Sequence, residues 1–169
     1  MMTKSALIAL VLGVTLTAGV SFAGDSDDRK ALLAALPAST ISLQQGIAAS
    51  AATGTPTSAK FEVEDGHLQL SVYTTKAGAY SEVVVDHVTG KIGKIEAITS
   101  GEDLTAAQSQ ARAIGKAKAS LSVAVDKAEQ ETTGFHAVSA TAELRKGHRT
   151  AVVLLQNGKQ LKSVSVSLE

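Results

Sequence analysis

Residues 83–92, with the sequence Val-Val-Val-Asp-His-Val-Thr-Gly-Lys-Ile, decide how this chain is expected to fold. The β-branched run interrupted by Thr-Gly-Lys predicts a strand, a turn and the start of a second strand. An Asp placed shortly before Thr-Gly can accept backbone hydrogen bonds and so fix the turn. We therefore interpret Asp86 as a residue of turn geometry rather than of catalysis.

The same order of elements is predicted twice along the chain. Residues 42–50 and 120–128 both place apolar or small residues at the i, i+3, i+4 and i+7 spacing of one helix face. Alternating strands follow each helix, and glycine turns such as Asp65-Gly66 and Lys146-Gly147 join them. Without a gap, six residues of the first copy fall opposite identical residues of the second: Glu62, Gly66, His67, Val72, Val83 and Val85 opposite Glu143, Gly147, His148, Val153, Val164 and Val166.

These repeats predict an α+β fold of two tandem units, residues 24–99 and 100–169. Each unit is expected to be a helix packed on a curved antiparallel sheet of three to four strands. A lead-in helix precedes each unit, Asp25 to Leu36 in the first and Leu104 to Ala119 in the second. Since a unit of roughly 60 residues buries only a modest fraction of its surface, we expect the two units to pack together.

Residues 1–23 have the pattern of an export signal. Lys4 precedes an apolar run from Ala6 to Val20, and Ser21-Phe22-Ala23 is a small-x-small cleavage site. The run is short for a membrane span, is diluted by Gly and Thr, and is not followed by a second one. We expect cleavage after Ala23 and a periplasmic or secreted protein with no stable membrane anchor.

Composition excludes several classes of function. The chain has no cysteine, so thiol nucleophiles and Cys-based zinc sites are excluded. Its 16 Lys+Arg and 16 Asp+Glu are interspersed, which argues against nucleic acid as a partner. It has no His-Glu-x-x-His, no Gly-x-Ser-x-Gly and no Gly-rich phosphate loop. Few aromatic residues argue against an aromatic-lined cavity for a small molecule. We expect a protein that is not an enzyme and has no cofactor.

The histidines keep a second hypothesis open. His67 and His148 occupy equivalent positions after turn glycines, and His87 follows Asp86. Together they could make a metal-responsive or ligand-responsive sensor. Their spacing does not show the convergence that a ligand cluster needs, so solvated turn histidines are the simpler interpretation.

The combined pattern resembles the PepSY domain family from about Thr40 to Glu169. The residues that carry the resemblance are the two Ser-Leu-x-x-small-aliphatic helices, their glycine stops at Gly54 and Gly134, and the turn of Asp86, Thr89, Gly90 and Lys91. The resemblance implies a helix that covers a curved antiparallel sheet. It also implies a binding role, since the domain occurs in the propeptides of thermolysin-like metalloproteases and in standalone exported bacterial proteins. It is thought to restrain or regulate peptidases, and its members share no catalytic residue.

The second unit departs from the family pattern near Glu169, which falls opposite Val88. The second copy therefore lacks an equivalent of the Thr-Gly-Lys turn and of the strand at 92–98. We expect a bare sheet edge at 159–168 that can pair with a peptide or an extended protein segment. A peptidase is the most concrete partner. The alternative is that the second lead-in helix or the first unit covers this edge. The candidate contacts are Leu161, Val164, Val166 and Leu168.

Overall fold

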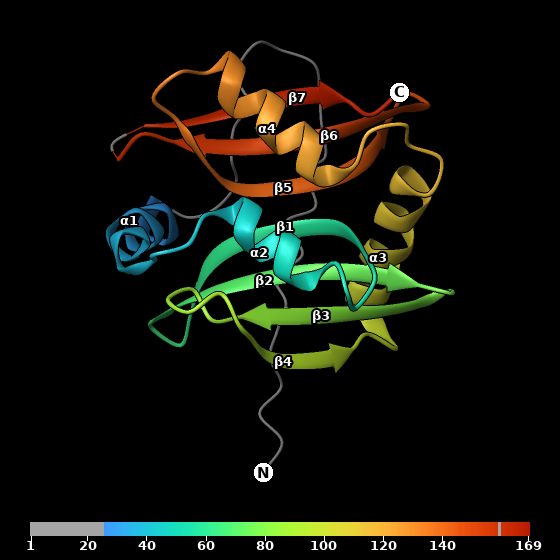
Figure 1. Cartoon of the computed structure of the whole chain (residues 1–169), viewed down its shortest axis with the longest axis horizontal. Coiled ribbons are helices and arrows are strands. Elements are labelled where there is room, and N and C mark those ends of the chain that lie inside the picture. The colour runs from blue at the N-terminus through green and yellow to red at the C-terminus, as the bar shows by residue number, and fades with distance from the viewer. Residues whose placement is uncertain (1–25, 159) are drawn as a thin grey trace.

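The computed structural model describes residues 26–158 and 160–169, and the expected leader at 1–23 lies outside them. The described residues form an α+β fold around one antiparallel sheet of seven strands, in the order β4-β3-β2-β1-β5-β6-β7 (Figure 1). The helical elements are α1 (Ser26–Ala35), η1 (Leu36–Ala38), α2 (Leu43–Ser50), α3 (Gly101–Ile114) and α4 (Leu121–Glu131). The strands are β1 (Thr55–Glu64), β2 (His67–Lys76), β3 (Ala79–Val85), β4 (Ile92–Ala97), β5 (His136–Arg145), β6 (His148–Gln156) and β7 (Leu161–Ser167).

The two predicted groups of strands are joined edge to edge at β1 and β5, so they form one sheet rather than two. Ser58, Ala59 and Lys60 lie opposite Thr141, Ala140 and Ser139 in antiparallel register. Both alanines are fully buried, and the Oγ atom of Ser58 lies 2.8 Å from Oγ1 of Thr141. Small side chains at this junction let the strands of both halves share one core.

Helices α2 and α4 cover the same face of the sheet, as Figure 1 shows. Each begins at a serine cap, since the hydroxyl of Ser42 accepts from the N–H of Gln45 and that of Ser120 accepts from the N–H of Val123. The predicted helix faces are confirmed. Their buried residues are Leu43, Gly46, Ile47 and Ser50 in α2, and Leu121, Ala124, Val125 and Ala128 in α4.

Corresponding details recur in the two halves. The turns after β1 and β5 hold Asp65 and Lys146 at φ 50°, each followed by a glycine at positive φ. Both strands also carry a register shift, between Pro56 and Ser58 and between Ala137 and Ser139. The Asp-Gly and Lys-Gly pairs of the sequence predicted the two turns. Nothing in the sequence indicated the two register shifts.

Two local expectations need correction. The predicted helix from Leu104 to Ala119 begins earlier, at Gly101, and ends at Ile114 with Gly115 as its C-cap; residues 115–119 are in turns, bends and irregular backbone. Gly54 is not in the left-handed conformation of a helix stop; a Cβ there would lie 2.7 Å from the carbonyl oxygen of Thr75.

The lead-in helices pack differently. α3 runs along one end of the sheet, at the right in Figure 1, and buries Ala107, Ala113 and Ile114. α1 has no buried residue, and the chain continues through Pro37 as the 3-10 turn η1. No single described helix is long and apolar enough to cross a membrane, although Ser26–Ala38 and Leu43–Ser50, bent by 78°, pass together by length and composition.

Gly46 offers a test of how closely α2 lies on the sheet. A Cβ at this position would overlap Cδ2 of the fully buried Leu70 and lie 3.1 Å from its Cγ. We expect Gly46→Ala to lower the free energy of unfolding by about 1–3 kcal/mol through overpacking, although alanine is the better helix former. Denaturant unfolding measures the change.

The control is the double variant Gly46→Ala with Leu70→Ala. It should be no less stable than Leu70→Ala alone, because removal of the leucine opens the space that the new methyl group needs. A Gly46→Ala variant as stable as the unchanged protein would contradict this close packing.

Candidate functional site

The predicted turn residues form a closed hydrogen-bonded loop. One carboxylate oxygen of Asp86 accepts from the N–H groups of Val88 and Thr89, at 2.8 and 2.7 Å. The N–H of Asp86 donates to the carbonyl of Lys91, and the N–H of Gly90 donates to the carbonyl of Asp86, both at 2.8 Å. Gly90 has φ 72°, a conformation that favours glycine. The carboxylate of Asp86 is thus engaged in turn geometry, as the sequence predicted.

This turn also positions the start of α2. The carbonyl of His87 accepts from the N–H groups of Thr40 and Ile41, at 3.0 and 3.4 Å, and from the hydroxyl of Ser39 at 3.0 Å. In the other half, the carbonyl of Leu168 accepts from the N–H groups of Lys118 and Ala119, at 2.7 and 3.3 Å. The same backbone contact therefore precedes both sheet-covering helices.

The structure does not bring the three candidate histidines together. His67 begins β2 and His148 begins β6, and these strands start at opposite ends of the sheet (Figure 1). His148 is exposed, and its Nδ1 lies 3.2 Å from a carboxylate oxygen of Glu169. Within residues 26–158 and 160–169, no three His, Asp or Glu side chains are grouped so that they could hold a metal ion.

A polar cluster on the sheet face away from α2 and α4 was not predicted. Lys60 pairs with Glu62 at 2.5 Å, and Ser71 donates to the same carboxylate at 2.9 Å. The hydroxyl of Tyr73 donates to Glu82 at 3.4 Å. Burial raises the pKa of Glu82, and the nearby charge of Glu62 raises it further. These side chains alternate with core residues along β1 to β3, so the sequence showed them only as the polar positions of strands.

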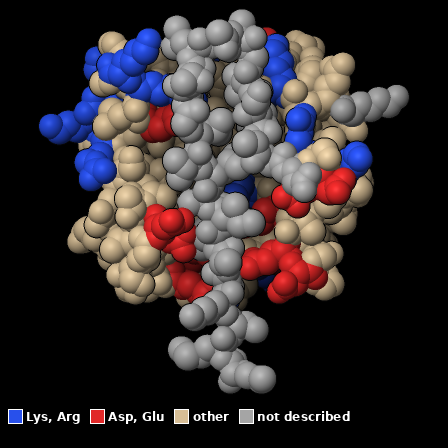
Figure 2. Space-filling view, turned by 180° about the vertical axis from the view of Figure 1, so that it is seen from behind, with Lys and Arg blue, Asp and Glu red and all other residues tan. Residues whose placement is uncertain are grey.

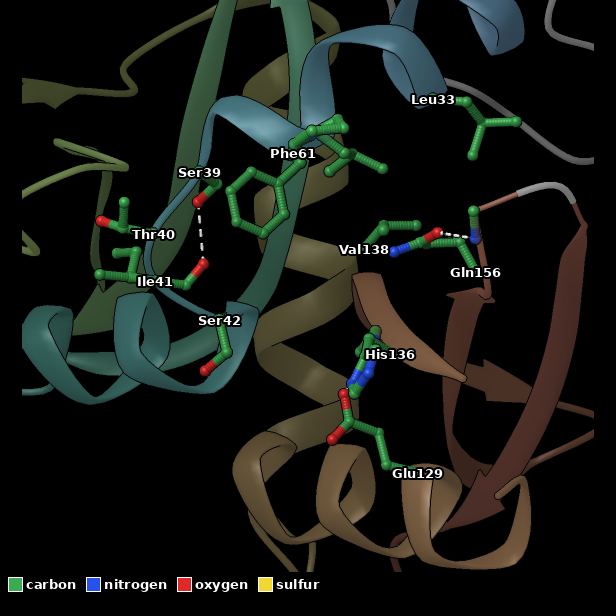
Figure 3. A pocket seen from close by; sticks show the side chains of 14 residues that line it. Leu33, Ser39, Thr40, Ile41, Ser42, Phe61, Glu129, His136, Val138 and Gln156 are labelled. Carbon is green, nitrogen blue, oxygen red and sulfur yellow. Dashed lines mark hydrogen bonds between the residues drawn. The ribbon is translucent and has the colours of Figure 1, made fainter. Parts of the chain in front are cut away.

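A cavity of about 410 Å³ lies where α1 and η1 approach the start of β5 (Figure 3). Its polar groups mostly serve the fold, since Glu129 accepts from the N–H of Ala137 at 2.6 Å and Ser39 donates to the carbonyl of Ile41 at 2.8 Å. Phe61 is the one aromatic residue among those that line it. This cavity could not be predicted from the sequence, because its lining comes from segments that are distant in the chain, such as η1 and the start of β5. The labelled lining residues are Leu33, Ser39, Thr40, Ile41, Ser42, Phe61, Glu129, His136, Val138 and Gln156.

The predicted binding edge, β7, is the last strand of the described sheet. The first half joins the second on the far side of β5, so it does not cover β7 as the alternative required. Of the predicted contacts, Val166 and Leu168 are buried in the core, where a partner cannot reach their side chains. Leu161 and Val164 are half-buried. The exposed side chains of the strand are those of Lys162, Ser165 and Ser167.

The hydrogen-bond register of β7 shows which backbone groups face outward. The N–H of Leu168 donates to Arg149 at 3.0 Å, and the N–H of Asn157 donates to Gln160 at 3.2 Å. In an antiparallel pair such bonded positions alternate with unbonded ones. The N–H and C=O groups of Ser163 and Ser165 therefore point away from β6.

Charge differs between the two halves. Residues 136–169 contain five basic residues (Lys or Arg) and two acidic residues (Asp or Glu). Residues 55–98 contain four basic and six acidic residues. From behind, basic side chains are prominent at the top, over β5 to β7, and acidic ones below (Figure 2). An acidic segment would therefore meet a favourable field near β7.

Comparisons of the chain with models of protein families, with curated proteins and with solved structures found no match.

Asp86 gives a prediction with a defined pH dependence. Hydrogen bonds from the N–H groups of Thr89 and Val88 hold the pKa of its carboxyl below the ordinary value of 3.8. A depressed pKa stabilises the fold above the ordinary value, and that stabilisation is lost as the pH falls through the lower folded value. We expect Asp86→Ala to lower Tm at neutral pH, and the difference from the unchanged protein to shrink as the pH falls below 3.8.

Thermal unfolding followed by circular dichroism between neutral and acid pH measures this difference. Asp86→Asn is the matched control: it retains one oxygen acceptor without the charge, so its loss at neutral pH should be smaller. An Asp86→Ala difference that grows on acidification would contradict the assigned role.

Proposed function

We propose that this chain is an exported, non-enzymatic recognition protein of two tandem PepSY-like units, and that it regulates a periplasmic or secreted peptidase. The observation that carries the proposal is the outer edge of β7, on which no other strand lies among residues 26–158 and 160–169, beside a strand framework repeated in both halves. An edge strand with unpaired N–H and C=O groups is a template for an extended segment of another protein.

The repeated contacts support the two-unit interpretation. The carbonyls of His87 and Leu168 hold the starts of α2 and α4 in the same way, and both helices begin at a serine cap. The central pair of Ala59 and Ala140 relates the two units by an approximate twofold symmetry, since Ser58 and Lys60 lie opposite Thr141 and Ser139. A duplicated module of this kind has the helix-on-sheet layering that the resemblance implies.

The chemistry of the turn supports recognition rather than turnover. The carboxylate of Asp86, the acidic residue of the family-like motif, accepts hydrogen bonds from two backbone N–H groups. Its neighbour Thr89 has its hydroxyl 3.4 Å from the N–H of Lys91. Both side chains stabilise the loop that leads from β3 to β4.

The test measures the effect of the purified protein on a thermolysin-like metallopeptidase and on peptidases secreted by the cell that makes the protein. We expect the initial rate of peptide hydrolysis to fall as the protein is added. The protein alone should not hydrolyse the same peptides. Unchanged rates at saturating protein would contradict a regulatory role.

Ser165→Pro is the matched variant. The N–H of Ser165 points away from β6, so proline there removes an outward donor and leaves the ladder with β6 intact. We expect this variant to fold and to lose its effect on hydrolysis. A rise in Tm on adding zinc or copper that is lost when His67 and His148 are replaced would instead favour a metal-responsive protein.

A further inference from the structure

In the first half of the molecule, β3 has a partner strand, β4, on its outer side. Among the described residues, β7 has no such partner strand. β3 pairs with β4 in antiparallel register, with Val83 opposite Ile95 and Val84 opposite Lys94. The N–H of Ile98 donates to the carbonyl of Tyr80 at 2.9 Å, so Glu82 and Val84 are the positions of β3 that bond to β4.

β7 occupies the place of β3 in the second half. Val164 and Val166 pair with Val153 and Ala151 of β6, as Val83 and Val85 pair with Val72 and Leu70 of β2. Ser163 and Ser165 then correspond to Glu82 and Val84, and the same alternation points their backbone groups away from the sheet. The outer side of β7 therefore has the hydrogen-bonding pattern that β4 satisfies in the first half.

The side chains around this edge define the segment that would fit. In the register of β4, an incoming residue at the position of Ile95 would lie opposite Val164, which is half-buried. The residue at the position of Ala97 would lie opposite Lys162, which is exposed. Opposite charges directly across a strand pair are favourable, and the surrounding half has an excess of basic residues.

We infer that the outer edge of β7 binds an extended, acidic segment of a partner protein, antiparallel to β7 and in the register that β4 has on β3. The apolar side chain of the segment packs beside Val164, and its acidic side chains lie near Lys162. This inference rests on the proposed function, because it specifies the edge through which recognition takes place.

The test uses the full chain and a synthetic peptide of residues 91–98 in which Ala97→Glu places a carboxylate opposite Lys162. In the same peptide, Lys91→Glu and Lys94→Glu make the rest of the segment acidic. The chain contains no cysteine, so a single introduced thiol reports position without interference. Val164→Cys is mixed with the peptide that has Ile95→Cys, under oxidising conditions. Facing residues of a pair without hydrogen bonds have the closest side chains, so a disulfide is expected at this pair.

Two matched thiols test the register. Lys162→Cys places the thiol on the same face but two residues away, and Ser165→Cys places it on the opposite face. We expect Val164→Cys to cross-link about tenfold faster than either, because both alternatives hold the thiols farther apart. Equal rates for the three variants would overturn the register, and no cross-link above that of a scrambled peptide would overturn the site.

Binding of the same peptide without a thiol supplies a second measurement. A proline in place of residue 94 removes a backbone donor that the pairing uses, and we expect about tenfold weaker binding. The peptide with both lysines restored should also bind more weakly. Two results would overturn the assignment. One is that the peptide contacts the outer side of β4 instead, and the other is that a second copy of the protein occupies β7.

These outcomes are separable from those of the peptidase test. Cross-linking in the expected register with no effect on any peptidase would support this edge and contradict the regulatory role. Peptidase inhibition without cross-linking would place that contact elsewhere and contradict this inference.

Discussion

The antiparallel pairing of β1 with β5 is the constraint on which the rest of the structure depends. Three residues on each strand make the junction, with Ala59 opposite Ala140 at its centre. Neither alanine is exposed, so the junction is also the middle of the hydrophobic core. Because the halves meet here, β4 and β7 become the two outer edges of a single sheet. The outer position of β7, where recognition is proposed, follows from this placement.

The helices reinforce the same junction. The side-chain amide of Gln44 in α2 donates to the carbonyl of Ser122 in α4 at 3.1 Å, and the hydroxyl of Ser122 lies 3.2 Å from the amide oxygen of Gln44. These two residues hold equivalent places in the two helices. The contact ties the helical layer together directly above the strands that join the sheet.

Much of the local structure could be predicted from the sequence, because it depends on short-range chemistry. Alternating apolar residues located the strands, Asp65-Gly66 and Lys146-Gly147 located two turns, and the faces of α2 and α4 followed from helical spacing. The role of Asp86 was also predictable, because its side chain accepts from the backbone N–H groups two and three residues later, and such contacts depend only on the local sequence. The edge position of β7 followed from the comparison of the two copies.

What the sequence did not reveal depends on contacts between distant segments. Pairing of β1 with β5 brings together residues some 80 positions apart, and small buried residues such as Ala59 and Ala140 occur in many strands without marking such a junction. The cavity beside η1 and the buried Glu82 depend in the same way on packing between elements. Among the predicted edge residues, the alternation of Val166 and Leu168 with serines placed them on the apolar face of the strand, and both are buried in the core rather than available to a partner.

We propose that a partner strand pairs with the outward backbone groups of β7, beyond which no strand lies among the described residues. Amide hydrogen exchange along β7 in the free protein measures this most directly. We expect alternation, with slow exchange at Val164 and Val166, whose N–H groups face β6, and fast exchange at Ser163 and Ser165. Strong protection at all four amides in the monomer would mean that the edge is already covered, and would rule out recognition by this edge.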